Sequence, residues 1–118
     1  MTIEQLRDYC LAKPYTTESF PFDQQTLVFK VDNKMFALAD VENFTSVNLK
    51  CDPERAIVLR EEYFGIIPGW HMSKTHWNTV KVGEDVSNSL FFELVDLSYD
   101  LVVQSLTKKR QRELGFLD

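Results

Sequence analysis

Residues 66–83 read IIPGWHMSKTHWNTVKVG, and this segment holds both tryptophans and both histidines of the chain. No carboxylate occurs between Tyr63 and Gly83. Aromatic rings, imidazoles, Lys and Asn side chains together supply π faces, hydrogen-bond donors and positive charge. The segment is therefore either a binding surface or a tryptophan hairpin whose polar side chains face water.

The pattern within this segment predicts a β-hairpin. Pro68 and Gly69 oppose helix formation, and residues 77–82 alternate as a strand does. We expect strands at residues 69–73 and 76–82 with a turn at residues 74–75, so that His71 lies opposite Asn78. One face then carries Trp70, Met72, Trp77 and Thr79, and the other carries His71, Asn78 and Val80. If the tryptophan face is buried, the solvent-facing donors are His71, Lys74, Asn78 and Lys81. If it is exposed, it is a stacking platform for bases.

The chain after this segment is expected to be helical. A cap at Ser87 or Ser89 opens a helix over residues 88–106, whose apolar positions form one wide stripe. Thr107 begins a last short helix, which carries the basic residues Lys108, Lys109, Arg110 and Arg112. The wide stripe must cover a sheet or other helices.

The chain before the segment begins with a helix and three strands. Thr2 and Gln5 have capping-box spacing and predict a helix that Pro14 ends. We expect residues 15–25 to be a connection with an aromatic foot in the core. Strands follow at residues 26–31, 34–39 and 45–50, with a two-residue turn at residues 32–33.

A second helix is predicted between these strands and the hairpin. Asp52, Pro53 and Glu54 form a strong helix start, and the helix is expected to run to Phe64. Gly65 then supplies the left-handed residue that often follows a helix. The element order is α-β-β-β-α-β-β-α plus a short C-terminal helix, which predicts an α+β domain with helices packed on an antiparallel sheet.

Composition limits the class of protein. A chain of 118 residues suits one domain, residues 1–118, and its 44% hydrophobic and 26% charged residues are near the globular average. The longest apolar runs are too short for a membrane-spanning helix, so we expect a cytoplasmic protein without membrane contact. We also expect a monomer or a weak dimer.

Charge is distributed unevenly along the chain. The net charge of −5 argues against a general polyanion binder. Residues 63–83 and 107–118 each carry a net charge of +2, whereas residues 84–106 between them carry −5. If the two positive segments meet in space, they form a local basic face on an acidic protein.

Catalytic and metal chemistry have weak support. His71 and His76 would point to opposite faces of an extended strand, and no zinc-type spacing, phosphate-binding glycine loop or nucleophile elbow occurs. A nucleophilic pairing of Cys51 with one of these histidines is the enzymatic alternative. We interpret Cys10 and Cys51 as reduced, packed thiols, and we expect no enzyme activity, metal or cofactor.

Several runs of the sequence resemble the MmcQ/YjbR family of small bacterial proteins. They are PGWHMSKTHWNTV at residues 68–80, LVDLSY at 94–99, KMFA at 34–37, VNLKCDPE at 47–54, and the pairs Tyr9-Cys10 and Lys13-Pro14. The similarity extends across nearly the whole chain. It implies a CyaY-like α+β fold and a double-wing DNA-binding role. Trp70 stands where a tyrosine is common in the family, which removes a hydroxyl but keeps the ring.

The sequence therefore predicts a non-enzymatic DNA-binding protein whose hairpin acts as a wing. The candidate contact residues lie in the hairpin and in the last helix: Trp70, His71, Lys74, His76, Trp77, Asn78, Lys81, Lys108, Lys109, Arg110 and Arg112. The rival hypothesis is a protein- or small-ligand-binding module of the same fold. The acidic net charge favours the rival, and the family resemblance favours DNA.

Overall fold

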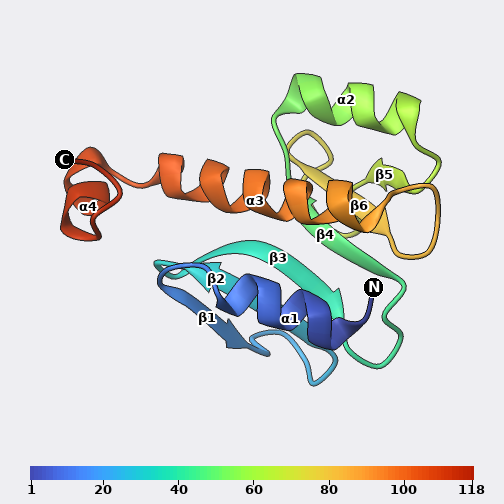
Figure 1. Ribbon diagram of the computed structural model, residues 1–118, viewed down its shortest axis with the longest axis horizontal. Coiled ribbons are helices and arrows are strands. Elements are labelled where there is room, and N and C mark those ends of the chain that lie inside the picture. The colour runs from blue at the N-terminus through green and yellow to red at the C-terminus, as the bar shows by residue number, and fades with distance from the viewer.

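Four helices and six strands make up the computed structural model, which describes residues 1–118 (Figure 1). The helices are α1 (Ile3–Leu11), α2 (Pro53–Glu62), α3 (Asn88–Ser105) and α4 (Lys108–Glu113). The strands are β1 (Thr16–Ser19), β2 (Thr26–Val31), β3 (Lys34–Asp40), β4 (Ser46–Lys50), β5 (Ile66–Pro68) and β6 (Trp77–Lys81). They form one antiparallel sheet in the order β1-β2-β3-β4-β6-β5. The predicted α+β class is confirmed, with one strand more than expected.

Local sequence signals explain where the elements begin. Each helix starts after a side-chain oxygen that accepts a first-turn N–H; these caps are Thr2, Asp52, Ser87 and Thr107. The Thr2 N–H also donates to Gln5 Oε1 at 2.8 Å, which completes the predicted capping box. The β2–β3 turn is the predicted pair Asp32 and Asn33, whose φ values of 47° and 65° suit a two-residue hairpin.

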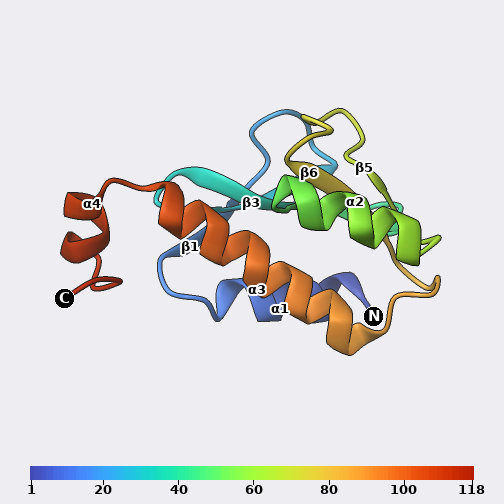
Figure 2. The ribbon, with the colours of Figure 1, turned by 90° about the horizontal axis from the view of Figure 1, so that it is seen from above.

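Helices α1, α2 and α3 all lie on one face of the sheet (Figure 2). The core between these layers contains 22 buried residues, and its largest fully enclosed side chains include Phe29, Phe36 and Phe91. The other side of the sheet, which we call the open face, has no helix over it. It carries a small apolar cluster of its own, formed by Val28, Leu38 and Trp77.

One buried serine on α3 joins the helix layer to the sheet. Ser98 donates to the Phe36 carbonyl at 2.5 Å and accepts from the Lys50 N–H at 2.8 Å. β3 and β4 pair only from Ala37 opposite Leu49 to Ala39 opposite Val47. The serine hydroxyl therefore takes the place of the next cross-strand bond and satisfies two backbone groups that diverge there.

Residues 15–25 differ from the connection that the sequence predicts. Thr16–Ser19 pairs with the end of β2 as the edge strand β1. Its inward side is polar, because Glu18 accepts two hydrogen bonds from Arg7 of α1 at 2.6 and 2.7 Å. Phe20 and Phe22 are 47% and 65% exposed, so the expected aromatic foot in the core is wrong.

The second hairpin is shifted from the predicted one. β5 pairs with β6 so that Pro68, rather than His71, lies opposite Asn78. The predicted strand at residues 69–73 is wrong, and residues 69–76 form a loop in place of a two-residue turn. Gly69 lies so close to β6 that a Cβ there would be 2.8 Å from the Trp77 Cβ. The chain leaves the sheet there and folds back over the open face.

Gly65 follows α2 in a conformation that the sequence does not predict. The helix ends in extended backbone at Tyr63, and Gly65 has no positive φ. The N–H groups of Gly65 and Phe64 donate to the Asp85 carboxylate at 2.8 Å each, and these bonds hold the pKa of Asp85 below its ordinary value. Close packing favours glycine here, because a Cβ would lie 2.9 Å from the Glu84 Cβ.

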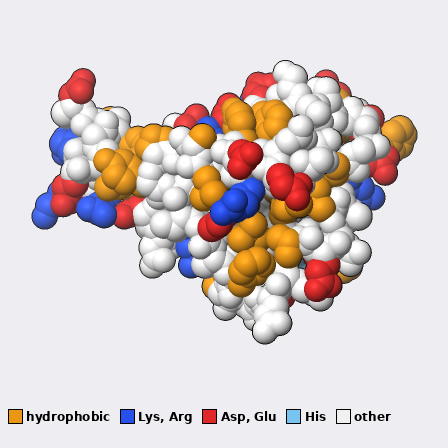
Figure 3. All heavy atoms as spheres, turned by 60° about the horizontal axis from the view of Figure 1, so that its bottom comes forward, with side chains coloured by type: hydrophobic (Ala, Val, Ile, Leu, Met, Phe, Trp, Pro, Cys, Tyr) orange, Lys and Arg blue, Asp and Glu red, His pale blue; other side chains and the backbone are white.

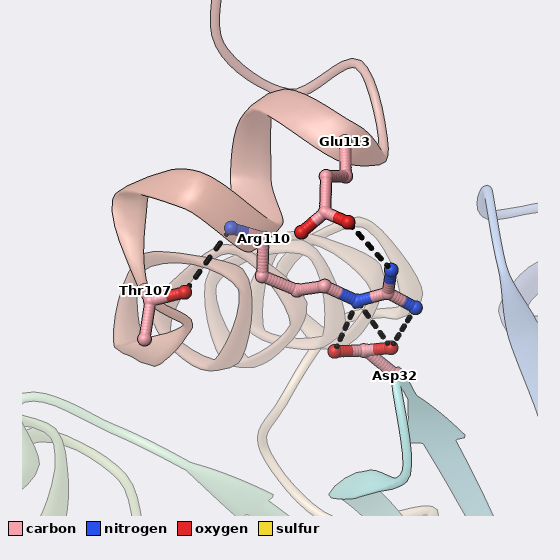
Figure 4. Close-up of polar contacts among 4 residues, drawn as sticks. All are labelled: Asp32, Thr107, Arg110 and Glu113. Carbon is pink, nitrogen blue, oxygen red and sulfur yellow. Dashed lines mark hydrogen bonds and ion pairs between the residues drawn. The ribbon is translucent and has the colours of Figure 1, made fainter.

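Helix α4 lies at the end of the molecule remote from α2, β5 and β6 (Figure 1). Arg110 donates to both carboxylate oxygens of Asp32 at 2.8–3.1 Å, which ties α4 to the β2–β3 turn (Figure 4). Arg110 also holds the pKa of Asp32 below its ordinary value. Lys and Arg side chains gather at this protruding end (Figure 3). The two positive segments of the sequence therefore do not meet in one basic face.

The bridge formed by Ser98 gives a stability prediction. Ser98→Ala leaves the Phe36 carbonyl and the Lys50 N–H without a partner in a fully buried position, so we expect a loss of about 2 kcal/mol in the free energy of unfolding. Urea denaturation followed by circular dichroism measures it. Ser105→Ala, at an exposed position of the same helix, is the matched control and should change stability by less than about 0.5 kcal/mol. Equal stability of Ser98→Ala and the wild type would contradict the bridge.

Candidate ligand groove on the open face

A groove of about 580 Å³ lies on the open face of the sheet. Two loops border it, residues 20–25 and residues 69–76, and both rise on the side away from the helices (Figure 2). Its lining residues come from these loops and from β2, β3 and β4: Phe22, Asp23, Gln25, Thr26, Leu38, Ala39, Asp40, Ser46, Asn48, Trp70, His71 and Met72. The volume is in the range of small-ligand sites in proteins.

Side chains of the open face form hydrogen bonds with both the N–H and the carbonyl of Trp70. The Trp70 N–H donates to Thr79 Oγ1 at 2.8 Å, and the Trp70 carbonyl accepts from Asn48 Nδ2 at 3.1 Å. The Thr79 hydroxyl donates to Asn48 Oδ1 at 2.5 Å, which locks the two side chains together. The loop is thus fixed to β4 and β6 by a closed set of hydrogen bonds, which we call the Asn48–Thr79 clamp.

Arg60 of α2 holds the far end of the same loop. Its Nε donates to Asn78 Oδ1 at 2.7 Å, and its Nη2 donates to the carbonyls of Trp77, at 3.2 Å, and Lys74. The guanidinium therefore satisfies backbone carbonyls that leave the sheet where β6 begins. At the other end of the loop, the Gly69 N–H donates to the Trp77 carbonyl at 2.9 Å.

The two tryptophans have opposite environments. Trp77 belongs to the apolar cluster of the open face, and Met72 from the loop packs against that cluster. The Trp70 side chain is left outside it and is 64% exposed. His71 adopts a left-handed backbone with φ of 59°, and its ring meets the indole of Trp70 edge to face with 4.9 Å between centroids. The loop thus presents an oriented indole–imidazole pair beside the groove.

Two carboxylates lie in the groove, and both are bonded to their own turns. Asp23 accepts from the N–H groups of Thr26 and Gln25 at 2.6 and 2.9 Å, and these bonds lower its pKa. Asp40 accepts from the N–H groups of Glu42 and Asn43. Because both side chains are carboxylates, this end of the groove is acidic.

The lysines of the open face have no carboxylate partner. The ion pairs of the protein involve α1, Lys13 in the segment after it, β1, α2, α3, α4 and the β2–β3 turn. Lys30, Lys50 and Lys81 alternate with inward-facing residues of β2, β4 and β6, and therefore project on the open face. Lys74 in the loop donates to the Gly69 carbonyl at 3.1 Å and is likewise without an acidic partner.

The structure separates the residues that the sequence predicts as one site. Trp70, His71, Lys74 and His76 are exposed on the loop, and Lys81 is half-buried on β6 beside a second, smaller groove that Trp70 also lines. Trp77 and Asn78 are buried, and the expectation that Asn78 faces solvent is wrong because its side chain points to Arg60. The basic residues of α4 lie at the opposite end: Lys108, Lys109, Arg110 and Arg112.

Cys51 and the two histidines do not form a catalytic arrangement. His71 and His76 are exposed, whereas Cys51 is buried among Leu49, Leu59 and other apolar residues. Burial raises the pKa of the Cys51 thiol above its ordinary value, which disfavours the nucleophilic thiolate. Both cysteines are free thiols, as predicted.

Sequence reasoning missed several residues of the groove. Ser46 and Asn48 were visible only as the polar positions of an alternating strand, and nothing in the sequence shows that β4 lies beside β6. Phe22 lies in the connection for which the sequence predicted only an aromatic foot in the core. The available signal was the alternation of polar and apolar residues at 45–50, because such an alternation marks polar side chains on an uncovered face of a sheet.

The fold and the groove define a small α+β domain with a sheet covered by helices on one face only. The family model described as YjbR matches residues 11–101. The chain is 36% identical to Escherichia coli YjbR over 115 residues, which covers 97% of this chain and 98% of that protein. It is 34% identical to YbdF of Escherichia coli O157:H7 over 112 residues, covering 94% and 92%. The chain belongs to the YjbR family, as the resemblance to MmcQ/YjbR proteins predicts.

Solved structures agree with this assignment. The Deinococcus radiodurans protein DR2400, described as a DUF419 domain, superposes with a TM-score of 0.93 at 41% identity, over 99% of this chain and 89% of that chain. A Pseudomonas syringae protein superposes with a TM-score of 0.74 at 26% identity, over 86% and 99%. No helix in the structure has both the length and the apolar character that crossing a membrane requires.

The Asn48–Thr79 clamp gives a prediction about the loop. Thr79→Val keeps the shape of a 4% exposed side chain but removes the acceptor of the Trp70 N–H. We expect the Trp70 amide to exchange with solvent about 10-fold faster or more, because its hydrogen bond is worth about 1 kcal/mol or more. NMR hydrogen exchange measures it, with Thr45→Val at an exposed position as the control. Unchanged exchange in a folded Thr79→Val protein would show that the clamp does not hold the loop.

Proposed function

We propose that this protein is a non-enzymatic nucleic-acid-binding protein and that its contact surface is the open face of the sheet. The observation that carries the proposal is the set of unpaired lysines on the face of the sheet that also presents an exposed indole. Lys30, Lys50 and Lys81 project from three strands of one face, and none has a carboxylate partner. Lysines free of internal ion pairs are available to phosphate groups.

The loop that covers the open face supplies the other contacts. Trp70 and His71 offer aromatic and imidazole surface, and the exposed His76 and Lys74 add donors. In this proposal the loop takes the part of the wing that the family resemblance implies. Trp77 and Asn78 are buried and bonded to Arg60, so in this proposal they position the loop and do not contact the ligand. Helix α4 lies at the other end of the molecule, so in this proposal one short nucleic acid does not contact both α4 and the loop.

A charge-matched pair of variants tests the proposal. We expect wild-type protein to bind nucleic acid with log K falling linearly as log salt rises. Lys50→Ala combined with Lys81→Ala should weaken binding and make that slope shallower by about 1.4–1.8, because two phosphate contacts are lost. Fluorescence anisotropy with labelled duplex and single-stranded DNA, each titrated at several salt concentrations, measures both quantities.

The control for this experiment removes the same charge elsewhere. Lys108→Ala combined with Lys109→Ala changes two exposed lysines on α4 and should leave the slope unchanged. Absence of any salt-dependent binding at low ionic strength would overturn the proposal. Equal weakening by the two double variants would move the contact surface away from the open face.

The acidic groove favours a second candidate function, a module that binds a peptide or small ligand. Its lining contains Asp23 and Asp40 but no lysine or arginine, and Phe22 and Trp70 add aromatic walls. Carboxylates beside aromatic rings suit a cationic group on a ligand.

This second candidate makes its own prediction. An arginine-containing aromatic peptide should quench the fluorescence of Trp70, and Asp40→Asn should weaken binding by about 5-fold or more, because an isosteric amide lacks the charge. Asp100→Asn, an exposed carboxylate on α3, is the control. A peptide that binds both variants as tightly as the wild type would exclude the groove as its site.

A further inference from the structure

We infer that the open face selects single-stranded nucleic acid, with a base stacked on Trp70 and phosphates held by Lys50 and Lys81 on either side of it. The inference rests on the proposed function and names its ligand class. Its basis is the position of the Trp70 backbone between Lys50 of β4 and Lys81 of β6, which the sheet register and the hydrogen bond from Trp70 to Thr79 fix.

The register places Trp70 between the two lysines. Lys50 lies opposite Trp77 at one end of the β4–β6 pair, and Lys81 lies opposite Ser46 at the other end. Thr79, which binds the Trp70 N–H, is midway between Trp77 and Lys81. The Trp70 backbone is thus anchored midway along the lysine track, which we define as the β4–β6 pair with Lys50 at one end and Lys81 at the other, and Trp70 and Lys81 line the same smaller groove.

The length of this track suits a few nucleotides. Lys81 is four positions after Trp77 on β6. Because a strand rises about 3.3 Å per residue, the two ends of the lysine track are about 13 Å apart. Stacked nucleotides advance about 3.4 Å each, so about four of them span that distance, and fewer are needed when the strand is extended. One strand can therefore contact both lysines while a base between them meets Trp70.

The exposed indole of Trp70 can stack on an unpaired base but not on the bases inside a duplex. Its side chain is 64% exposed, and its neighbour His71 meets it at 71° instead of lying flat against it. Bases in a duplex are already stacked on each other, so their faces are unavailable to a side chain unless the helix is opened. Bases of a single strand stack readily on an exposed aromatic ring.

The acidic groove disfavours the second phosphate backbone of a duplex, and so favours single-stranded over double-stranded nucleic acid. Asp23 and Asp40 line the space beside Trp70, opposite in charge to the lysine track. An uncharged base can enter this space, where Ser46 and Gln25 offer hydrogen-bonding groups to its edge. A phosphate there would meet two carboxylates. The surface therefore accepts one backbone along the lysines and disfavours another beside it.

The test compares three probes of the same length, about 12 residues. They are a single-stranded oligodeoxynucleotide, the matching duplex, and a single strand of equal charge that carries abasic residues at its centre. We expect the single strand to bind more tightly than the duplex and to quench the tryptophan fluorescence. The abasic strand should bind more weakly, because it keeps the phosphates but loses the stacked base.

Trp70→Leu is the decisive variant. It should weaken binding of the normal single strand by about 5-fold to 150-fold, leave the salt slope unchanged and remove the preference over the abasic strand. Trp70→Phe should restore part of the affinity, since a smaller ring still stacks. Phe64→Leu, at a 93% exposed aromatic residue after α2, is the matched control and should have no effect. The near-ultraviolet circular dichroism of the buried Trp77 verifies that each variant is folded.

The outcomes separate this inference from the proposed function. Equal binding of duplex and single strand, with Trp70→Leu unaffected and the salt dependence intact, would overturn the single-strand inference and leave nucleic-acid binding standing. Loss of affinity in Trp70→Leu for normal and abasic strands alike would also overturn stacking. Absence of binding to all three probes would overturn both.

Discussion

Helices cover only one face of the six-stranded sheet, and this constraint governs the other face. The open face carries the buried apolar side chains of Val28, Leu38 and Trp77, which need cover from water. Residues 69–76 supply that cover by folding back so that Met72 packs on the cluster. The loop is therefore attached to the sheet at Trp70 and Met72, while the Trp70 side chain stays on the surface.

Polar bonds then decide how the exposed residues are presented. The apolar packing of Met72 holds the loop against the sheet but does not set its orientation, because apolar contacts are not directional. The hydrogen bonds of Asn48 and Thr79 fix the position of the Trp70 backbone. Arg60 does the same for the carbonyls at the other end. A surface aromatic residue on a fixed backbone loses little conformational entropy when a ligand binds. The framework thus favours recognition by a preformed site over folding on binding.

The sequence predicts the parts of this structure that depend on neighbouring residues. Helix caps such as Thr2 and Ser87 and the Asp32–Asn33 turn are local, and they are correct. The hairpin register was wrong because its loop is held by contacts 22 and 31 residues apart in sequence, from Asn48 to Trp70 and to Thr79. The lysine track could not be seen either, since Lys50 and Lys81 come to lie at the two ends of one strand pair only through the pairing of β4 with β6.

Net charge is a poor guide to the ligand of this protein, because charges of opposite sign are sorted across the sheet. The net charge is −5, yet much of the acidity lies on the outer surfaces of α2 and α3, at Glu54, Glu61, Glu62, Glu93 and Asp100. Those groups are separated from the open face by the helix layer and the sheet, which together exceed the screening length of about 8 Å at physiological salt. Lys30, Lys50 and Lys81 project on the open face itself, where Asp23 and Asp40 of the groove and Glu84 beside Lys81 oppose them.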